Sequence, residues 1–197
     1  MSRFYLVRHG TVDRMNEVLH GRTANIHLNQ DGRAQAERVA EALSRARLEA
    51  VYSSPLERAQ ETTEIICRVT GLPLEIEPAF NEVNFGRWTS RRFADLQSEP
   101  EWQRFNSNRS RAGAPGGESM LEAQLRAVSA LEALRFKHNV IAVVTHGDII
   151  RAVTLHYLGV HLDLIHRLRI DTGSITVLEL DHCGVQFTLI NGHSLSR

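Results

Sequence analysis

The sequence predicts an α/β fold with a mostly parallel sheet and an antiparallel C-terminal strand. Three short apolar runs, at residues 4–7, 50–53 and 140–144, indicate buried strands. Helical patterns separate these runs, and strands joined through helices pair in parallel with right-handed crossovers. Two segments of alternating polarity, 174–180 and 185–190, flank a polar turn and predict a hairpin at the end of the chain.

The composition is that of one globular domain, which we expect to span residues 1–197. The chain is 42% hydrophobic and 23% charged, and its 23 basic and 23 acidic residues balance. This balance argues against nucleic acid or a membrane surface as a partner. Cys67 and Cys183 lie far apart without metal-ligand spacing, and no apolar run is long enough for a signal peptide or membrane span. We therefore expect a cytoplasmic protein.

The first strand ends in Arg8-His9-Gly10, where the glycine would permit a backbone turn. Residues 11–29 then form a long polar loop that contains Asn16, and loops of this length are usually functional. Asn29 is the expected N-cap of a helix over residues 30–47.

The second strand, residues 50–53, leads into a strong helix start. Ser54 is expected to cap this helix, Pro55 to occupy its first position and Glu57 to complete a capping box. This places Arg58 in the first turn, and Gly71 is the expected C-cap. The predicted buried stripe comprises Leu56, Ala59, Thr63, Ile66 and Val69.

Residues 78–117 follow a short strand at 74–77 and form an irregular, aromatic-rich excursion, which we expect to cover the substrate. Short helices are predicted at 92–97 and 101–106. We interpret each arginine here as a solvated surface group, although together they make the excursion modestly basic, a bias that a substrate with a second anionic group would fit. These arginines are Arg87, Arg91, Arg92, Arg104, Arg109 and Arg111.

A long helix is predicted over residues 118–137, with a buried face that comprises Leu121, Leu125, Val128, Leu131 and Leu134. The strand at 140–144 then ends in Thr145-His146-Gly147, and helices at 149–159 and 160–167 follow.

Three predicted strand ends therefore carry the distinctive polar residues. The carboxyl ends of parallel strands share one edge of the sheet, which is where ligands bind in open α/β folds. Arg8, His9, Arg58 and His146 would converge there beside two helix N-termini. Arginines and helix N-termini suit a phosphoryl group, because both present N–H donors to its oxygens.

Phosphate binding alone does not need two histidines. A neutral imidazole can take up a phosphoryl group, and a second, protonated imidazole can stabilise its oxygens. An alkoxide leaving group also needs a proton donor, for which Glu82 is the candidate, since partial burial among aromatic neighbours would raise its pKa.

Other chemistries fit less well. The histidines His9, His20, His27 and His146 lack the close ligand pairs of a metal site, and the arginines would repel a cation. The chain also lacks the G-x-S-x-G elbow of a serine hydrolase, a P-loop and a G-x-G-x-x-G motif.

These motifs together resemble the histidine phosphatase superfamily, also called the phosphoglycerate mutase-like family. The resemblance covers nearly the whole chain. It rests on residues 6–10 (LVRHG), 52–62 (YSSPLERAQET), Glu82 with Phe85-Gly86 and Trp88, and 144–147 (VTHG).

The resemblance implies a three-layer α/β/α sandwich and a phosphohistidine on His9. It also implies that Arg8, Arg58, His146 and Gly147 hold the phosphoryl group, with Glu82 as proton donor and later base, and with no metal and no cofactor. A phosphate-binding Asn of the family would fall at or beside Asn16. The chain departs from the family pattern at Val12 and at Thr89-Ser90.

The sequence thus predicts a metal-independent phosphatase, of the histidine acid phosphatase type, that acts on a small phosphorylated metabolite. Two alternatives stay open: a phosphoglycerate mutase-type isomerase, and a catalytically silent phosphate-binding module. Because the dedicated mutases that the chain resembles tend to be longer, the resemblance and the length of 197 residues together favour the phosphatase over the mutase. The terminal hairpin also offers an edge through which two copies could form a homodimer.

Overall fold

The computed structural model describes residues 1–195, and its sheet has the strand order β3-β2-β4-β1-β5-β6. The strands β1 (Ser2–Arg8), β2 (Ala50–Ser53), β3 (Leu74–Ile76) and β4 (Val140–Thr145) are parallel. The strand β5 (Ile175–Leu180) is antiparallel to β1, and β6 (Val185–Gly192) is antiparallel to β5. The mixed sheet predicted from the sequence is therefore confirmed.

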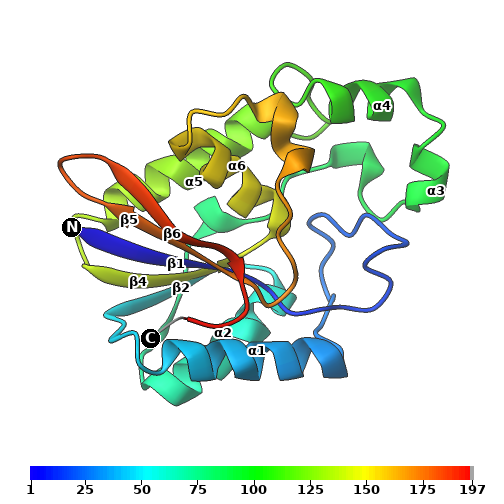
Figure 1. Ribbon diagram of the computed structural model, residues 1–197. Coiled ribbons are helices and arrows are strands. Elements are labelled where there is room, and N and C mark those ends of the chain that lie inside the picture. The colour runs from blue at the N-terminus through cyan, green and yellow to red at the C-terminus, as the bar shows by residue number, and fades with distance from the viewer. Residues whose placement is uncertain (196–197) are drawn as a thin grey trace.

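Helices cover both faces of this sheet. The helices α1 (Gln30–Leu43) and α2 (Glu57–Thr70) lie on one face, and α5 (Met120–Leu134) and α6 (Gly147–Tyr157) lie on the other (Figure 1). Because strand side chains alternate between faces, β1 sends Phe4 and Leu6 to one core and Tyr5 and Val7 to the other. This is the predicted α/β/α sandwich. No helix in the described chain is long and apolar enough to cross a membrane.

The excursion contributes to the core on the α5 and α6 side. It consists of η1 (Pro78–Phe80), η2 (Gly86–Trp88), α3 (Phe93–Leu96) and α4 (Pro100–Ser107). Phe85, Trp88 and Phe105 are buried in that core. Backbone hydrogen bonds also tie the excursion to the loop after β1, with Leu19 N–H donating to the Arg91 carbonyl at 2.9 Å. These contacts hold the two segments over the same end of the sheet.

Helix starts and buried faces differ partly from the prediction. Asn29 caps α1 as expected, because its Oδ1 accepts the Gly32 N–H at 2.9 Å. In contrast, α2 begins at Glu57 without a side-chain cap, so Ser54 is not the predicted cap. Val69, Leu121 and Leu125 are exposed rather than buried. In α5 the packed face instead uses small side chains that allow close approach, namely Ala123 and Ala127 together with Met120, Val128, Leu131 and Leu134.

Candidate functional site

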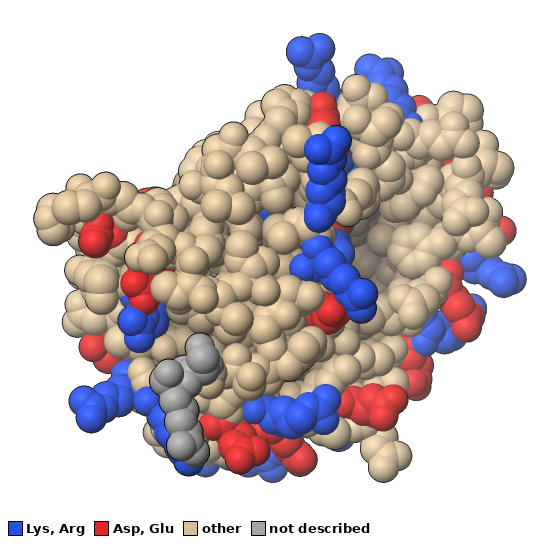
Figure 2. Space-filling view, viewed as in Figure 1, with Lys and Arg blue, Asp and Glu red and all other residues tan. Residues whose placement is uncertain are grey.

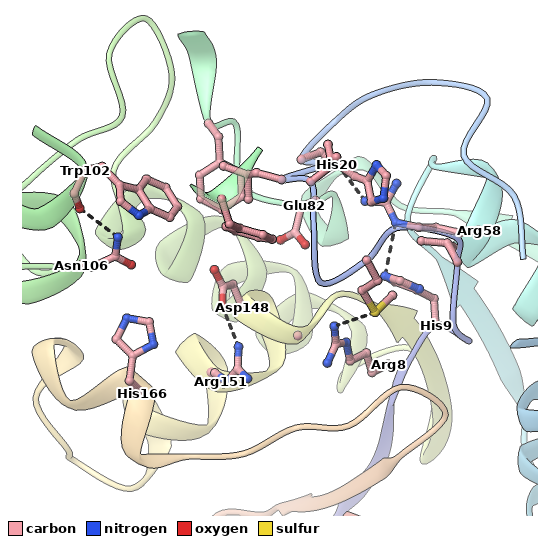
Figure 3. Close-up of a pocket in the computed structure, with 18 of the residues that line it drawn as sticks. Arg8, His9, His20, Arg58, Glu82, Trp102, Asn106, Asp148, Arg151 and His166 are labelled. Carbon is pink, nitrogen blue, oxygen red and sulfur yellow. Dashed lines mark hydrogen bonds and ion pairs between the residues drawn. The ribbon is translucent and has the colours of Figure 1, made fainter. Parts of the chain in front are cut away.

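The carboxyl ends of β1, β4 and β2 meet at one edge of the sheet, where Arg8 is paired with Thr145 and Ser53 with Val144. A cavity of about 260 Å³ opens there, and its lining includes Arg8, His9, Arg58, Glu82 and Gly147. Figure 2 shows a hollow on this side of the molecule, beside basic side chains, and Figure 3 shows the residues that converge on the cavity. The structure therefore brings most of the predicted site together.

Close backbone packing fixes the turn that carries His9. A Cβ on Gly10 would lie 2.3 Å from the Gly32 carbonyl oxygen, so only glycine fits. The φ angle of Gly10 is not positive, and this glycine thus serves close approach rather than the unusual turn expected from the sequence. The Gly10 N–H also donates to Thr62 Oγ1 at 3.1 Å, which anchors the turn to α2.

The hydrogen bonds of His9 define its tautomer. Its Nδ1 lies 2.7 Å from the Gly10 carbonyl, which can only accept, so Nδ1 carries the proton. Its Nε2 accepts a hydrogen bond from Arg58 Nε at 3.2 Å. Burial, with the charges of Arg58 and Arg8, lowers the pKa of His9 well below its usual range. The imidazole is therefore neutral, with a lone pair on Nε2 that can act as a nucleophile.

Two arginines around His9 each have a guanidinium N–H group without a hydrogen-bond partner in the described chain. Arg58 is 2% exposed, and its Nη2 donates to the Gly21 carbonyl at 2.7 Å. Arg8 Nη1 donates to the Ile170 carbonyl at 2.6 Å. Yet Arg58 Nη1 and Arg8 Nε are buried without a hydrogen-bond partner within residues 1–195. Buried donors are nearly always paired, so two unpaired guanidinium nitrogens at one cavity indicate a binding site for an anion.

His146 is fully buried and is held by Ser54. Its Nε2 lies 2.7 Å from Ser54 Oγ, which explains why Ser54 does not cap α2. Its Nδ1 lies 3.4 Å from Arg58 Nη2 and 3.8 Å from Glu82 Oε2. Burial and the nearby Arg58 lower the pKa of His146 well below its usual range. A protonated His146, as the sequence predicts, therefore requires a negative charge beside it.

Glu82 sits opposite His146 with its carboxyl largely buried. Burial and repulsion from Asp148, opposed by Arg58 and Arg8, raise the pKa of Glu82 to about 7. Its Oε1 accepts the Val83 N–H at 2.9 Å. A carboxyl with this pKa can donate a proton near neutral pH and can take one back.

Arg126 and Arg22 hold the Glu82 loop in place, and neither was singled out from the sequence. Arg22 Nε donates to the Glu82 carbonyl at 2.8 Å, and Arg126 Nη2 donates to the same carbonyl at 3.2 Å. Glu118 Oε1 pairs with both guanidinium groups and accepts the Asn84 N–H at 2.7 Å. Arg22 and Arg126 lie far from Glu82 in the sequence, so no local sequence pattern indicated that they support its loop.

Gly147 and Asn16 have different outcomes. Gly147 begins α6, and a Cβ on it would lie 3.1 Å from Arg8 Nε, so glycine lets Arg8 lie against the helix N-terminus. Asn16 is exposed and does not line the cavity. The chain turns at Arg14, which has a φ of 56°, and Met15 lines the cavity instead, with its Sδ 3.6 Å from Arg8 Nη2.

The cavity also contains charged residues that the sequence analysis did not assign to the site. These are Arg109, Asp148, Arg151 and His166. The interpretation of Arg109 as a solvated surface group is wrong, since its side chain is 3% exposed. Asp148 directly follows the His146-Gly147 motif and could have been found from it, whereas Arg109 has the same local sequence context as its exposed neighbours.

A group of potential metal ligands lies elsewhere. In the described part of the chain, ligand atoms of Asp181, His182 and Cys183 lie within 4.8 Å of one another. These residues lie on the β5–β6 turn, where His182 and Cys183 are exposed and Asp181 is partly exposed, and they do not line the cavity. They take no part in the site at the strand ends.

Comparisons with known proteins agree with this geometry. Residues 4–193 match the family model described as "Histidine phosphatase superfamily (branch 1)". The chain is 36% identical over 159 residues to phosphoglycerate mutase-like protein 4 of Arabidopsis thaliana, covering 77% of this chain and 69% of that protein. It is 28% identical over 185 residues to phosphoserine phosphatase 1 of Hydrogenobacter thermophilus, covering 92% and 88%. The structure of Bacillus stearothermophilus YhfR shares the fold with a TM-score of 0.91 at 23% identity, covering 98% of each chain.

Proposed function

We propose that this chain, which belongs to the histidine phosphatase superfamily (branch 1), is a phosphatase that acts on a small phosphomonoester. The observation that carries the proposal is the state of His9. Its Nε2 has a lone pair, and an unpaired buried donor from each of Arg8 and Arg58 lies at the same cavity. The phosphatase name of one relative supports hydrolysis as the outcome.

In the first step, Arg58 Nε gives up its hydrogen bond to His9 Nε2 and donates to a phosphoryl oxygen instead. The freed lone pair of Nε2 then attacks phosphorus, and the bond to the alkoxide oxygen breaks. Arg8 and Arg58 hold the phosphoryl oxygens, and the N-terminus of α6 adds its dipole. The arriving dianion raises the pKa of His146, so this imidazole can gain a proton and donate through Nδ1. Glu82, with a pKa of about 7, gives its proton to the leaving oxygen.

In the second step, the Glu82 carboxylate takes a proton from water. As this proton leaves, the water oxygen attacks phosphorus, the bond to Nε2 breaks, and inorganic phosphate leaves with His9 neutral again. A mutase would differ only here, because a second substrate hydroxyl would replace the water. The mutase-like name of a 36% identical relative keeps this alternative in view.

We propose that the reaction needs no metal ion, because Arg8, Arg58 and His146 supply the positive charge that the transferring oxygens require. A chelator should then leave the rate unchanged.

We also propose a cytoplasmic location for the protein. Its two cysteines, Cys67 and Cys183, are free in the structure, which is consistent with a reducing compartment.

The test is hydrolysis of 4-nitrophenyl phosphate by wild type and by His9→Ala, with chelator present. We expect turnover by wild type and a loss of about 10⁴-fold or more in His9→Ala. His182→Ala, an exposed histidine on the β5–β6 turn, is the matched control and should keep full activity. Isomerisation of 3-phosphoglycerate without phosphate release would favour the mutase, and phosphate binding without any turnover would favour the silent module.

A further inference from the structure

The cavity has a second charged end, which the proposed chemistry at His9 does not use. Asp148, Arg151 and His166 lie on the side of the cavity away from His9 and Arg58 (Figure 3), and Arg109 lines the same end. We propose that this distal cluster binds a carboxylate on the leaving group of the phosphomonoester. The proposal rests on the proposed function, since it names the substrate class of the same cavity.

The one carboxylate in the cluster is already paired. Asp148 Oδ1 accepts from Arg151 Nη1 at 2.9 Å, and Asp148 Oδ2 faces Arg109 Nη1 at 3.4 Å. The arginines also hold the pKa of Asp148 below its usual range, so it is charged. With both oxygens committed to arginines, Asp148 is a poor partner for a cationic substrate group.

Arg109, in contrast, still has an N–H donor that can bind an acceptor. Arg109 Nε is buried without a hydrogen-bond partner in the described chain, although the side chain is only 3% exposed. Its Nη2 donates to Asn106 Oδ1 at 2.7 Å, and its guanidinium lies 4.3 Å from the centre of the Phe105 ring. An arginine that lines a cavity, is held this firmly and has a donor that no described residue accepts is prepared for an acceptor from outside the protein.

The net charge of the cluster indicates one negative charge on the ligand. Arg109 and Arg151 contribute two positive charges and Asp148 one negative charge. His166 adds none, because burial and the adjacent Arg109 lower the pKa of this imidazole. A single carboxylate neutralises the remaining charge, whereas a second phosphate dianion would exceed it.

The dimensions of the cavity limit the rest of the substrate. The volume is about 260 Å³, so only a small molecule can occupy the cavity and reach both ends. Apolar side chains of Phe85, Phe93 and Trp102 also line the cavity. The substrate class is therefore a phosphomonoester with a short chain between its phosphate and its carboxylate.

The test measures binding without turnover. Phosphonoacetate, 3-phosphonopropanoate and 4-phosphonobutanoate are titrated calorimetrically against the alkylphosphonates of matching length. We expect wild type to prefer the carboxylate by about 10-fold or more at one length at least, as for a charge-assisted hydrogen bond. Arg109→Met and Arg151→Met should each reduce this preference to about threefold or less, and Arg151→Lys should restore part of it.

Arg104→Met is the matched control, because Arg104 is an exposed arginine of α4 outside the cavity, and it should keep the full preference. Thermal melting identifies a variant that fails to fold, and Arg151, with 23% of its side chain exposed, is the safer substitution. No preference at any of the three lengths, or one that survives both Met variants, overturns the proposal. Hydrolysis of 4-nitrophenyl phosphate tests the phosphatase separately, since this substrate has no carboxylate.

Discussion

The two ends of the cavity are built in different ways. At the clamp end, formed by Arg8, His9, Arg58 and His146, the side chains follow strand ends and a helix start, and backbone contacts such as Gly10 against Gly32 hold them. The distal cluster joins side chains from the excursion, α6 and η3 (Leu162–Arg167), mostly through Asp148. Changes at the clamp end should therefore affect every substrate, and changes at the distal end only some.

The largest effect is expected for Arg58→Met. This change removes the donors that face His9 Nε2 and the phosphoryl group, and we expect kcat/KM to fall by about 10³-fold or more with every phosphomonoester. Arg68→Met changes an exposed arginine of the same helix and should be silent. A loss confined to carboxylate substrates would contradict the division between the two ends.

Glu82→Gln should separate substrates by their leaving groups. Alkyl phosphates need a proton on the departing oxygen, so their rates should fall by about 10²-fold or more. The rate at which Glu82→Gln first releases 4-nitrophenol should stay within about tenfold of the wild-type rate, because this leaving group departs as an anion. Rapid-mixing kinetics with both substrates checks the difference, and Glu64→Gln, on an exposed position of α2, is the control. Equal losses would remove Glu82 as the proton donor.

The raised pKa of Glu82 also predicts a pH-dependent cost in stability. The folded protein holds this proton up to about pH 7, whereas the unfolded chain releases it near the ordinary value of 4.5. The folded state thus binds more protons between these values, and stability falls as pH rises through this window. The free energy of unfolding of Glu82→Gln should equal that of wild type at pH 4. At pH 8 it should be higher than that of wild type by at most about 3 kcal/mol. Denaturant unfolding at both pH values measures this, and a constant difference would contradict it.

Gly10→Ala should disturb the clamp end through the backbone. The added Cβ would meet the Gly32 carbonyl oxygen, and we expect a loss of about 1–3 kcal/mol in the free energy of unfolding. Gly113→Ala, whose Cβ would have no neighbour closer than 3.9 Å, should change stability by less than about 0.5 kcal/mol. If Gly10→Ala changed the free energy of unfolding as little as Gly113→Ala, the turn would be able to accept a Cβ without strain.

The contrast between the two ends also decides what the sequence could predict. Arg8, His9 and His146 were found because they lie at the ends of apolar strands, and the parallel order of the strands then placed them together. Arg109 was missed because the partner of its buried charge, Asp148, lies 39 residues away. No local pattern distinguishes it from the exposed Arg104.

Local patterns misled where a tertiary contact competed with them. Ser54 has the sequence of a helix cap, yet its hydroxyl pairs with His146 Nε2, a contact between residues 92 positions apart. Asn16 was expected near the phosphate, but the turn at Arg14 exposes it and brings Met15 to the cavity. In both cases spacing along the chain was known and the direction of the side chain was not.

The central claim is that His9 carries the phosphoryl group during turnover, and Glu82→Gln offers the most direct test. With 4-nitrophenyl phosphate this variant can form the intermediate without an acid but lacks the base that activates water. We predict a burst of 4-nitrophenol equal to the enzyme concentration, and an acid-labile phosphoryl group that peptide mass spectrometry places on His9. Steady release without a burst, or a phosphoryl group on another residue, would contradict the account.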